Sequence, residues 1–247
     1  MPWCVTRRAM FDSRWDHALM PSRQRLLIAV LAAGESRRFQ GIKLAQPLST
    51  PSSVNSGQSI LQRHIDRLAR FTSAPLAMES SNQVSASLLV VLGAHAHELR
   101  PQLEAFGANQ CTLLHNADWQ TGLSSSLRAA AIYAKAQQFD GMLLTLADQV
   151  ALTFEDYQQL IETWQTSQQS VAALYHHEAG KLDELGAPAI FNASILDLLT
   201  DLTGDRGAKS ILKQLANVGE LVAVPLPHAA IDIDTKADLA SWLALKE

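Results

Sequence analysis

The chain has 247 residues, of which 47% are hydrophobic and 18% are charged, and this composition suits one compact α/β domain with a sizeable core. Its formal net charge of −4 and its isoelectric point near 6.1 argue against a nucleic acid or a membrane surface as the main partner. Two cysteines, Cys4 and Cys111, are too few for a disulfide framework, and no apolar run is long enough for a transmembrane helix, so we expect a cytoplasmic protein.

The start of the chain differs from the rest. Residues 1–24 show no hydrophobic period, mix charged with aromatic side chains, and lack the apolar core of a secretory signal. We therefore predict an N-terminal extension at 1–24, which we interpret as flexible, and a single domain at 25–247.

The first predicted strand, at 26–31, is a continuous apolar run of the kind that is buried on both faces of a parallel sheet. It ends in Ala-Ala-Gly at 32–34, where small side chains let a phosphate approach backbone N–H groups. Ser36, Arg38 and Lys43 follow, and the two cations would offset phosphate charge. The spacing matches neither a P-loop nor a dinucleotide fingerprint, but we interpret the segment as a phosphate-binding loop.

The chain then alternates between strand and helix patterns. Polar, serine-containing segments at 49–57 and 72–86 are interpreted as loop insertions, and the helix predicted between them, at 58–71, carries His64 in its apolar stripe. We interpret His64 as a packed residue at the edge of the core. Further strands are predicted at 87–93, 111–114, 141–147, 170–175 and 221–224, and further helices at 123–138, 153–166 and 236–246. This alternation predicts a three-layer α/β domain with a mostly parallel sheet.

Two polar segments follow strands. The segment at 116–128, NADWQTGLSSSLR, has the serines of a capped helix start. Asp148 comes directly after the apolar strand at 141–147, and a carboxylate at that end of a central strand lies where open α/β sheets bind their ligands. An aspartate at this place could also serve only as a turn or cap residue.

The last candidates lie near the end of the chain. Asp232 and Asp234 would point the same way if their segment were extended, and would then present two carboxylates to one site. Asp-x-Asp also occurs as helix N-cap chemistry, so both interpretations stay open at this stage.

In this order, the loop after the first strand, the serine segment, Ala-Asp-Gln at 147–149 and Asp-Ile-Asp-Thr at 232–235 resemble the signature of MobA-like nucleotidyltransferases, in particular the molybdenum cofactor cytidylyltransferase branch. The resemblance runs from about Leu26 to the C-terminus. It implies a Rossmann-like nucleotidyltransferase fold with one antiparallel strand. The chain departs from the family pattern at Gln40, Val150 and Ala187, where glycine, proline and histidine are usual, and His176 and His177 lie near Ala187 in sequence.

The resemblance also implies site residues. The implied catalytic residues are Arg38, Lys43 and Asp148. The implied nucleotide-binding residues are Leu31, Ala32, Ala33, Gly34, Ser36, Arg38, Lys43, Ser124, Ser125 and Asp148. Mg²⁺, which prefers oxygen ligands, would be held by Asp148 together with Asp232 or Asp234.

The implied reaction is transfer of CMP from CTP to molybdenum-loaded molybdopterin with release of pyrophosphate, and the implied partner is a recipient molybdenum hydroxylase. The cytosine preference follows from Leu-Ala-Ala-Gly at 31–34, because the guanylyl branch carries Leu-Ala-Gly-Gly. Two alternatives stay open. One is a cytidylyl- or uridylyltransferase for another phosphorylated small molecule, and the other is a non-catalytic module that binds a nucleotide or cofactor.

Overall fold

The computed structural model describes residues 23–48, 57–73, 83–107, 110–176, 183–204 and 207–245. The predicted extension lies outside these residues except at its last two positions, and so do most of the loop at 49–57 and the middle of the loop at 72–86. Within the described part, no helix combines the length and the apolar character that crossing a bilayer requires.

The core of the fold is a seven-stranded sheet in the order β3-β2-β1-β4-β6-β5-β7. The strands are β1 (Gln24–Ala32), β2 (Val84–Leu92), β3 (Thr112–His115), β4 (Gly141–Leu146), β5 (Ser170–Tyr175), β6 (Glu184–Asn192) and β7 (Leu221–Pro225). Only β6 runs antiparallel to its neighbours among these strands. The prediction of a mostly parallel sheet with one antiparallel strand is therefore confirmed.

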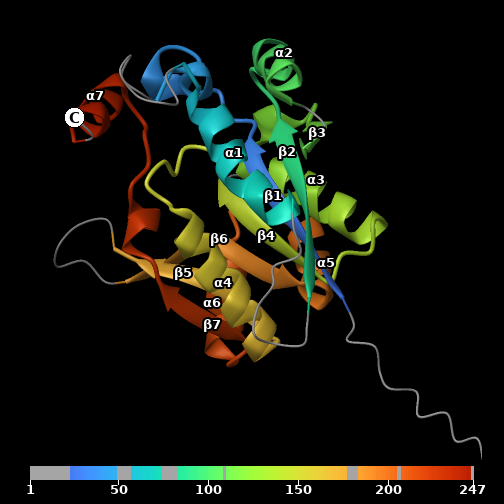
Figure 1. The fold of residues 1–247 in the computed structure, drawn as a ribbon. Helices are drawn as coiled ribbons and strands as arrows, with labels where there is room; N and C mark the ends of the chain where they lie inside the picture. Colours follow the sequence, from blue (N-terminus) through green and yellow to red (C-terminus); the bar gives the residue numbers. More distant parts are fainter. Residues whose placement is uncertain are drawn as a thin grey trace, which may run out of the picture.

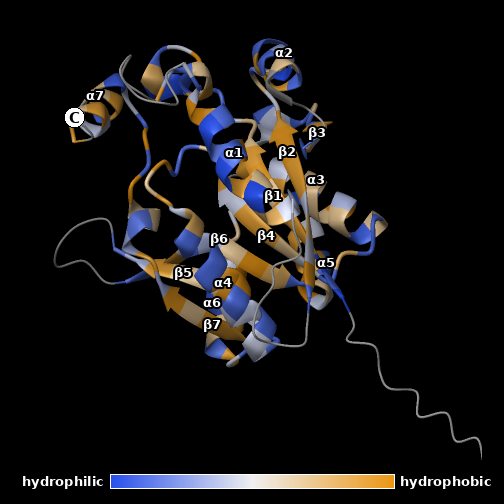
Figure 2. Ribbon diagram, viewed as in Figure 1, coloured by the Kyte–Doolittle hydropathy of each residue, from blue (hydrophilic) through white to orange (hydrophobic). Residues whose placement is uncertain are grey.

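Helices cover both faces of the sheet (Figure 1). They are α1 (Ile60–Ser73), α2 (Ala96–Gly107), α3 (Leu123–Ala136), α4 (Phe154–Ser167), α5 (Leu196–Thr200), α6 (Lys209–Asn217) and α7 (Lys236–Ala244). Side chains alternate along β1, so that Ile28 and Val30 pack on the side of α1 and α4 while Leu27 and Ala29 pack on the side of α3 and α6. The strands are apolar and the helices are mixed in character, as a three-layer α/β domain requires (Figure 2).

Two boundaries differ from the prediction. The segment 72–86 was expected to be a loop, but α1 continues to Ser73 and β2 begins at Val84. The burial pattern explains the second difference, because Val84 is fully buried and pairs with Gln24 of β1 despite its polar neighbours. The short helix α5 was not predicted; its five residues are too few to show a helical period.

The C-terminal segment brings remote residues to the site. After β7 the chain makes a 3₁₀ turn at Pro227–Ala230 and runs along the molecule to α7, which stands away from the sheet at the upper left of Figure 1. A hydrogen bond from the Ile233 N–H to the Asp148 carbonyl, at 3.2 Å, ties this segment to the turn after β4. His64 is buried as predicted and lies against the hydroxyl of Tyr157 in the core.

Candidate functional site

The loop after β1 bends twice through left-handed backbone. Ser36 has φ 56° and Gln40 has φ 55°, on either side of the 3₁₀ turn Arg37–Phe39. The family pattern has glycine where this chain has Gln40, and the geometry explains the preference, because a left-handed conformation costs about 1 kcal/mol for a residue with a Cβ. The bend is therefore present in this chain in spite of the substitution.

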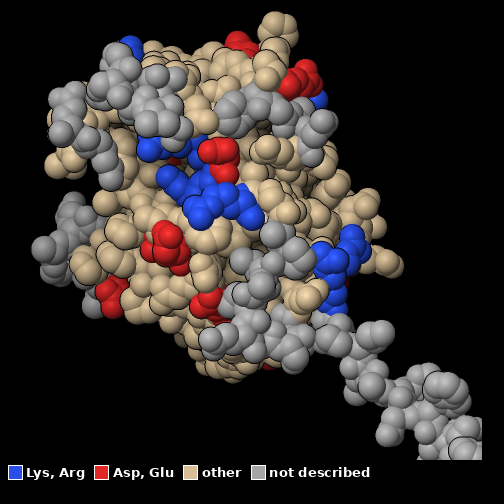
Figure 3. All heavy atoms as spheres, in the orientation of Figure 1, with Lys and Arg blue, Asp and Glu red and all other residues tan. Residues whose placement is uncertain are grey.

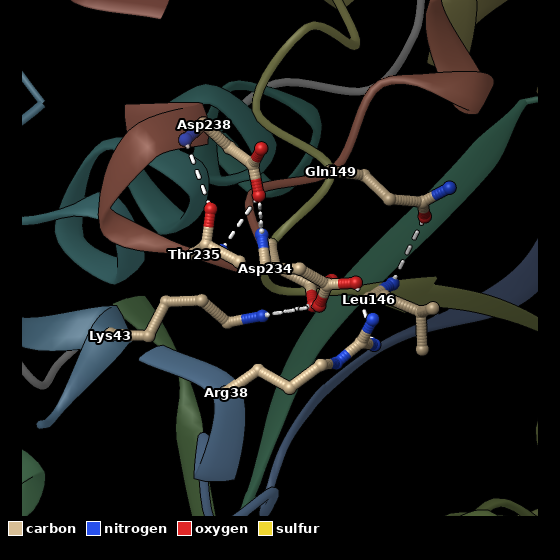
Figure 4. Close-up of polar contacts among 8 residues, drawn as sticks. Arg38, Lys43, Leu146, Gln149, Asp234, Thr235 and Asp238 are labelled. Carbon is tan, nitrogen blue, oxygen red and sulfur yellow. Dashed lines mark hydrogen bonds and ion pairs between the residues drawn. The ribbon is translucent and has the colours of Figure 1, made fainter. Parts of the chain in front are cut away.

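Two cations and two carboxylates meet beside this loop (Figure 4). The Lys43 ammonium lies 2.7 Å from Asp148 Oδ2 and 3.5 Å from Asp234 Oδ1. The Arg38 guanidinium lies 2.6 Å from Asp234 Oδ2. Lys43 is buried with 8% of its surface exposed, whereas the Arg38 side chain is 74% exposed. The four residues come from three separate parts of the chain and form one charge-balanced cluster, which we call the ionic cluster.

Local structure fixes Asp234 in this cluster. Thr235 caps α7, and Asp238 completes the capping box. The Asp238 carboxylate accepts hydrogen bonds from the N–H groups of Thr235, at 2.7 Å, and Asp234, at 3.0 Å. These hydrogen bonds, chiefly those from Thr235, lower the pKa of Asp238, so its carboxylate holds the Asp234 backbone while the Asp234 side chain faces Lys43.

The two carboxylates of the Asp-x-Asp motif do not lie together. Asp234 belongs to the ionic cluster, whereas exposed Asp232 lies on the side of Tyr175. Burial raises the pKa of the Tyr175 hydroxyl to about 12, and the charges of Glu184 and Asp232 add to the effect. The segment is not a regular strand, which is why the alternation expected from an extended chain does not apply.

The ionic cluster fits a hard divalent cation. Asp148 Oδ1 is buried and has no hydrogen-bond partner among the described residues, so one carboxylate oxygen is available for a ligand. No group of three or more His, Cys, Asp or Glu side chains with metal-binding geometry occurs in the described part of the chain. Mg²⁺ is typically held by one or two carboxylates and substrate phosphates, so Asp148 and Asp234 suffice as a protein donor set.

A cleft of about 410 Å³ opens at the carboxyl ends of β1 and β4. Of the residues predicted to bind nucleotide, those that line it are Leu31, Ala33, Gly34, Ser36, Lys43 and Asp148. Arg38 lines a smaller adjoining cavity of about 190 Å³ together with Ser36, Lys43 and Asp234. Ala32 is buried in the core beneath the loop. The cleft is therefore bounded by the loop and by the ionic cluster.

The serine segment borders this cleft through a different serine from those predicted. Ser124 and Ser125 are buried, and their hydroxyls donate to the carbonyls of Gly204 and Gly122. Ser126 lines the cleft, and the buried Asn116 amide donates to the hydroxyls of both Ser125 and Ser126. The resemblance was applied to Ser124 and Ser125 and missed Ser126, because the sequence does not show which of three consecutive serines faces the cleft.

Trp119 and Gln120, which were not predicted as site residues, also line the cleft. Gly93 explains how Trp119 comes so near the loop, because a Cβ on Gly93 would lie 2.7 Å from the Cβ atoms of both Ala33 and Trp119. Only glycine leaves room for both residues to come this near. The family pattern around the tryptophan could have suggested this role.

A second pocket, of about 550 Å³, lies on the other side of Leu31, Leu123 and Leu146. Its lining is mostly apolar and includes Ala187 and Ala189 of β6 and Leu212 of α6. The charged residues among its lining are Lys209 and Lys213, both on α6. Ala187 thus lies in this pocket, while His176, considered as a replacement for the missing histidine, lines neither pocket and pairs with Asp183. His177 lies outside the described residues.

Comparisons with known proteins agree with this geometry. Residues 28–218 match the family described as the MobA-like NTP transferase domain. No curated protein matches the chain in sequence.

Solved structures share the fold at low sequence identity. A homologue of Rv0371c from Mycobacterium sp. strain JC1 is 26% identical, with a TM-score of 0.58 and coverage of 91% of this chain and 100% of that one. Rv0371c of Mycobacterium tuberculosis H37Rv, solved in complex with manganese, is 19% identical, with a TM-score of 0.56 and coverage of 90% and 100%. The 4-diphosphocytidyl-2C-methyl-D-erythritol synthase of Anaerococcus prevotii is 13% identical, with a TM-score of 0.65 and coverage of 91% and 97%.

Proposed function

Because the chain belongs to the MobA-like NTP transferase domain family, we propose that it transfers CMP from CTP to molybdenum-loaded molybdopterin and releases pyrophosphate. The observation that carries the nucleotidyl transfer is the ionic cluster at the mouth of the cleft. A buried lysine between two carboxylates, beside a loop of small residues, is suited to a triphosphate and a divalent cation.

The donor nucleotide is assigned to the cleft between the loop and Trp119. Its phosphates would meet the backbone of Ala33 and Gly34 and the cations of Lys43 and Arg38. Its base would lie toward Trp119 and Ser126. Both cations already pair with carboxylates, so binding of the nucleotide would exchange these contacts for phosphate contacts instead of exposing new charge.

The proposed reaction is an in-line displacement. A phosphate oxygen of the acceptor forms a bond to the α-phosphorus of CTP, the bond from that phosphorus to the bridging oxygen breaks, and pyrophosphate leaves with the electron pair. Such a reaction requires positioning and charge neutralisation more than covalent help from the protein. Lys43 is placed to neutralise charge on the phosphates, and Arg38 to hold the leaving pyrophosphate at the open side of the cleft.

Asp148 and Asp234 would hold the divalent cation, which we propose to be Mg²⁺. When bound, the ion would supply charge stabilisation at the phosphates. The buried Oδ1 of Asp148 supports this role, as does the manganese complex of a protein with the same fold. Asp234 is preferred to Asp232 as the second ligand, because it shares Lys43 with Asp148.

The acceptor is assigned to the second pocket. Leu31, Leu123 and Leu146 line both pockets and form the wall between them. An acceptor phosphate near Leu146 would therefore lie next to Asp148. A sugar or polyol phosphate would find few hydrogen-bond partners on the apolar walls, whereas a flat ring system would bury apolar surface there. Lys209 and Lys213 would offset the charge of a phosphorylated acceptor, and a molybdenum hydroxylase is the proposed recipient of the product.

The proposal is tested by incubating purified protein and Mg²⁺ with each of the four ribonucleoside triphosphates and molybdenum-loaded molybdopterin. We expect pyrophosphate release with CTP and a product whose mass is that of the cytosine dinucleotide. Equal use of GTP, or no transfer from any nucleotide to this acceptor, would remove the cytidylyltransferase assignment. Transfer of CMP to a different phosphorylated molecule would support the alternative acceptor class.

A further inference from the structure

Gln149, directly after Asp148, has a side chain that is almost fully buried, with 2% of the residue exposed. Its amide nitrogen donates one hydrogen bond to the Ala187 carbonyl, at 2.8 Å, and one to the Ala229 carbonyl, at 3.0 Å. Its amide oxygen accepts from the Leu146 N–H, at 3.3 Å. Both amide hydrogens and the oxygen are therefore used, each toward a different part of the backbone.

These three backbone groups belong to the three parts of the proposed site. Leu146 ends β4, just before Asp148, and lies in the wall between the two pockets. Ala187 lies in β6 and lines the second pocket. Ala229 lies in the 3₁₀ turn that leads into the segment carrying Asp234. One side chain thus joins the turn of Asp148, the proposed acceptor pocket and the C-terminal segment, and Figure 4 shows it to the right of the ionic cluster, pointing away from Lys43.

The placement of Asp234 depends on this connection. The segment after the turn at 227–230 is irregular, so no sheet pairing sets its distance from β4. Within the described residues, two hydrogen bonds connect it to the turn after β4, from Gln149 to Ala229 and from Ile233 to Asp148, while His228 pairs with Asp156 of α4 and Asp234 with Arg38 and Lys43. Loss of the Gln149–Ala229 hydrogen bond would loosen the 3₁₀ turn that leads to Asp234, and would leave the sheet pairing intact.

We propose that Gln149 is a positioning residue that sets the separation of Asp148 and Asp234 and aligns the donor cleft with the acceptor pocket. The inference rests on the proposed function, since the two carboxylates matter only if they act on one metal–nucleotide complex. Gln149 does not reach the cleft, and it acts through the backbone of Ala229 and Ala187.

The test compares Gln149→Met and Gln149→Glu with wild type. Methionine keeps the length and removes all three hydrogen bonds. Glutamate keeps the acceptor oxygen but places a second oxygen against the two carbonyls. Gln165→Met is the matched control, because Gln165 is also a buried glutamine but lies at the far end of α4. Calorimetry measures CTP binding with and without Mg²⁺, and steady-state assays give kcat and the Mg²⁺ concentration for half-maximal rate.

We expect both Gln149 variants to bind CTP normally without Mg²⁺ but to lose about 10- to 100-fold in the Mg²⁺-dependent gain in affinity and in kcat, as for residues that orient metal ligands from behind. Gln165→Met should change neither quantity. Unchanged Mg²⁺ dependence in the folded Gln149 variants would overturn the inference, and so would wild-type CTP binding that is insensitive to Mg²⁺. Loss of the fold in both variants would assign Gln149 a purely structural role and overturn it as well.

The outcomes separate this inference from the proposed function. If wild type transfers no CMP to molybdopterin, yet binds CTP in a Mg²⁺-dependent way that both Gln149 variants weaken, the acceptor assignment fails and the positioning role stands. If transfer occurs and the variants match wild type, the positioning role fails and the function stands.

Discussion

The two pockets share a wall and differ in chemistry. The donor cleft is bounded by Lys43, Asp148 and the loop backbone, and the ionic cluster stands at its edge. The second pocket is apolar, with two lysines on α6 as its charged residues. In the proposed function, the donor cleft binds the triphosphate that every nucleotide carries. The second pocket would instead select the acceptor by its shape and apolar surface. On the face seen in Figure 3, Lys and Arg side chains form a group at the centre and a second group at the right, with acidic side chains beside and between them.

The largest effect on turnover is expected from Asp148→Asn in the donor cleft. The amide keeps the shape of the side chain and loses its charge, so we expect kcat to fall about 100-fold or more, in line with the several kcal/mol that a metal clamp contributes. The melting temperature should change little. Turnover and Mg²⁺ dependence are measured together.

Asp140→Asn is its matched control. Asp140 precedes β4 as Asp148 follows it, and its carboxylate accepts a hydrogen bond from the Arg25 N–H at the opposite end of the strand. We expect near-normal turnover from this variant. If Asp148→Asn also kept normal turnover and normal Mg²⁺ dependence, Asp148 would be a turn residue only.

The second test removes the cations of the donor cleft one at a time. Lys43→Met should weaken CTP binding about 10- to 100-fold, the range for losing a charge-assisted hydrogen bond in a buried place. It should also lower stability, because Asp148 and Asp234 would face each other without the cation between them. Arg38→Met, at an exposed position, should weaken CTP binding less and leave the melting temperature unchanged. Equal affinities in wild type and both variants would remove the phosphate assignment.

The variant Lys209→Met tests whether the second pocket binds the acceptor. Lys209 lies at the start of α6 and pairs with Glu184 at 2.6 Å on the surface. If it serves the acceptor, the variant should raise the acceptor KM several-fold while the dissociation constant for CTP stays unchanged. Lys135→Met, in an exposed pair with Asp197 elsewhere, should change neither. An effect on CTP binding equal to that on the acceptor would mean that the two pockets are not separate in function.

The sequence predicted most of the fold, because β1, β2 and β4 are apolar runs and α1 has a clear apolar stripe. No strand was assigned at β6, where Gly186 and Pro188 interrupt the pattern. The loop of small residues and the carboxylate after β4 were also predictable, since both follow directly from the ends of buried strands. Prediction was weaker where a residue acts through distant contacts. Nothing local to Gln149 indicates that it binds the backbone of Ala187 and Ala229, which lie 38 and 80 residues away.

The choice between Asp232 and Asp234 illustrates the same limit. Alternation along an extended strand would put both carboxylates on one side. The segment is instead irregular, and the capping box of Thr235 and Asp238 decides which of the two faces Lys43. That decision depends on where α7 begins relative to β4, which no spacing in the sequence encodes. The roles of both aspartates in metal binding stay predictions.

The smallest expected effect belongs to Ala33, on which the preference for cytosine depends. The Ala33 side chain borders the cleft. Gly93 lies close to Ala33 and Trp119, because a Cβ added to Gly93 would lie 2.7 Å from the Cβ atoms of both residues. The Ala33 carbonyl also accepts a hydrogen bond from the Ala94 N–H, at 3.1 Å. The Ala33 methyl group therefore fills space in the wall of the cleft in which the base is proposed to lie.

Ala33→Gly removes this methyl group and loosens the backbone, which leaves space in the cleft for a purine. One methyl group in an apolar pocket contributes about 1–3 kcal/mol to discrimination between substrates. A glycine backbone can adjust to either base, so we expect an effect near the lower end of this range, a fall of about tenfold in the preference for CTP over GTP. Competition between the two nucleotides, measured as the ratio of kcat/KM, checks this. Ala94→Gly makes the same change next to the cleft without lining it and should keep the wild-type ratio. If Ala33→Gly kept it too, the base would be selected elsewhere, and Trp119 and Ser126 would be the next residues to vary.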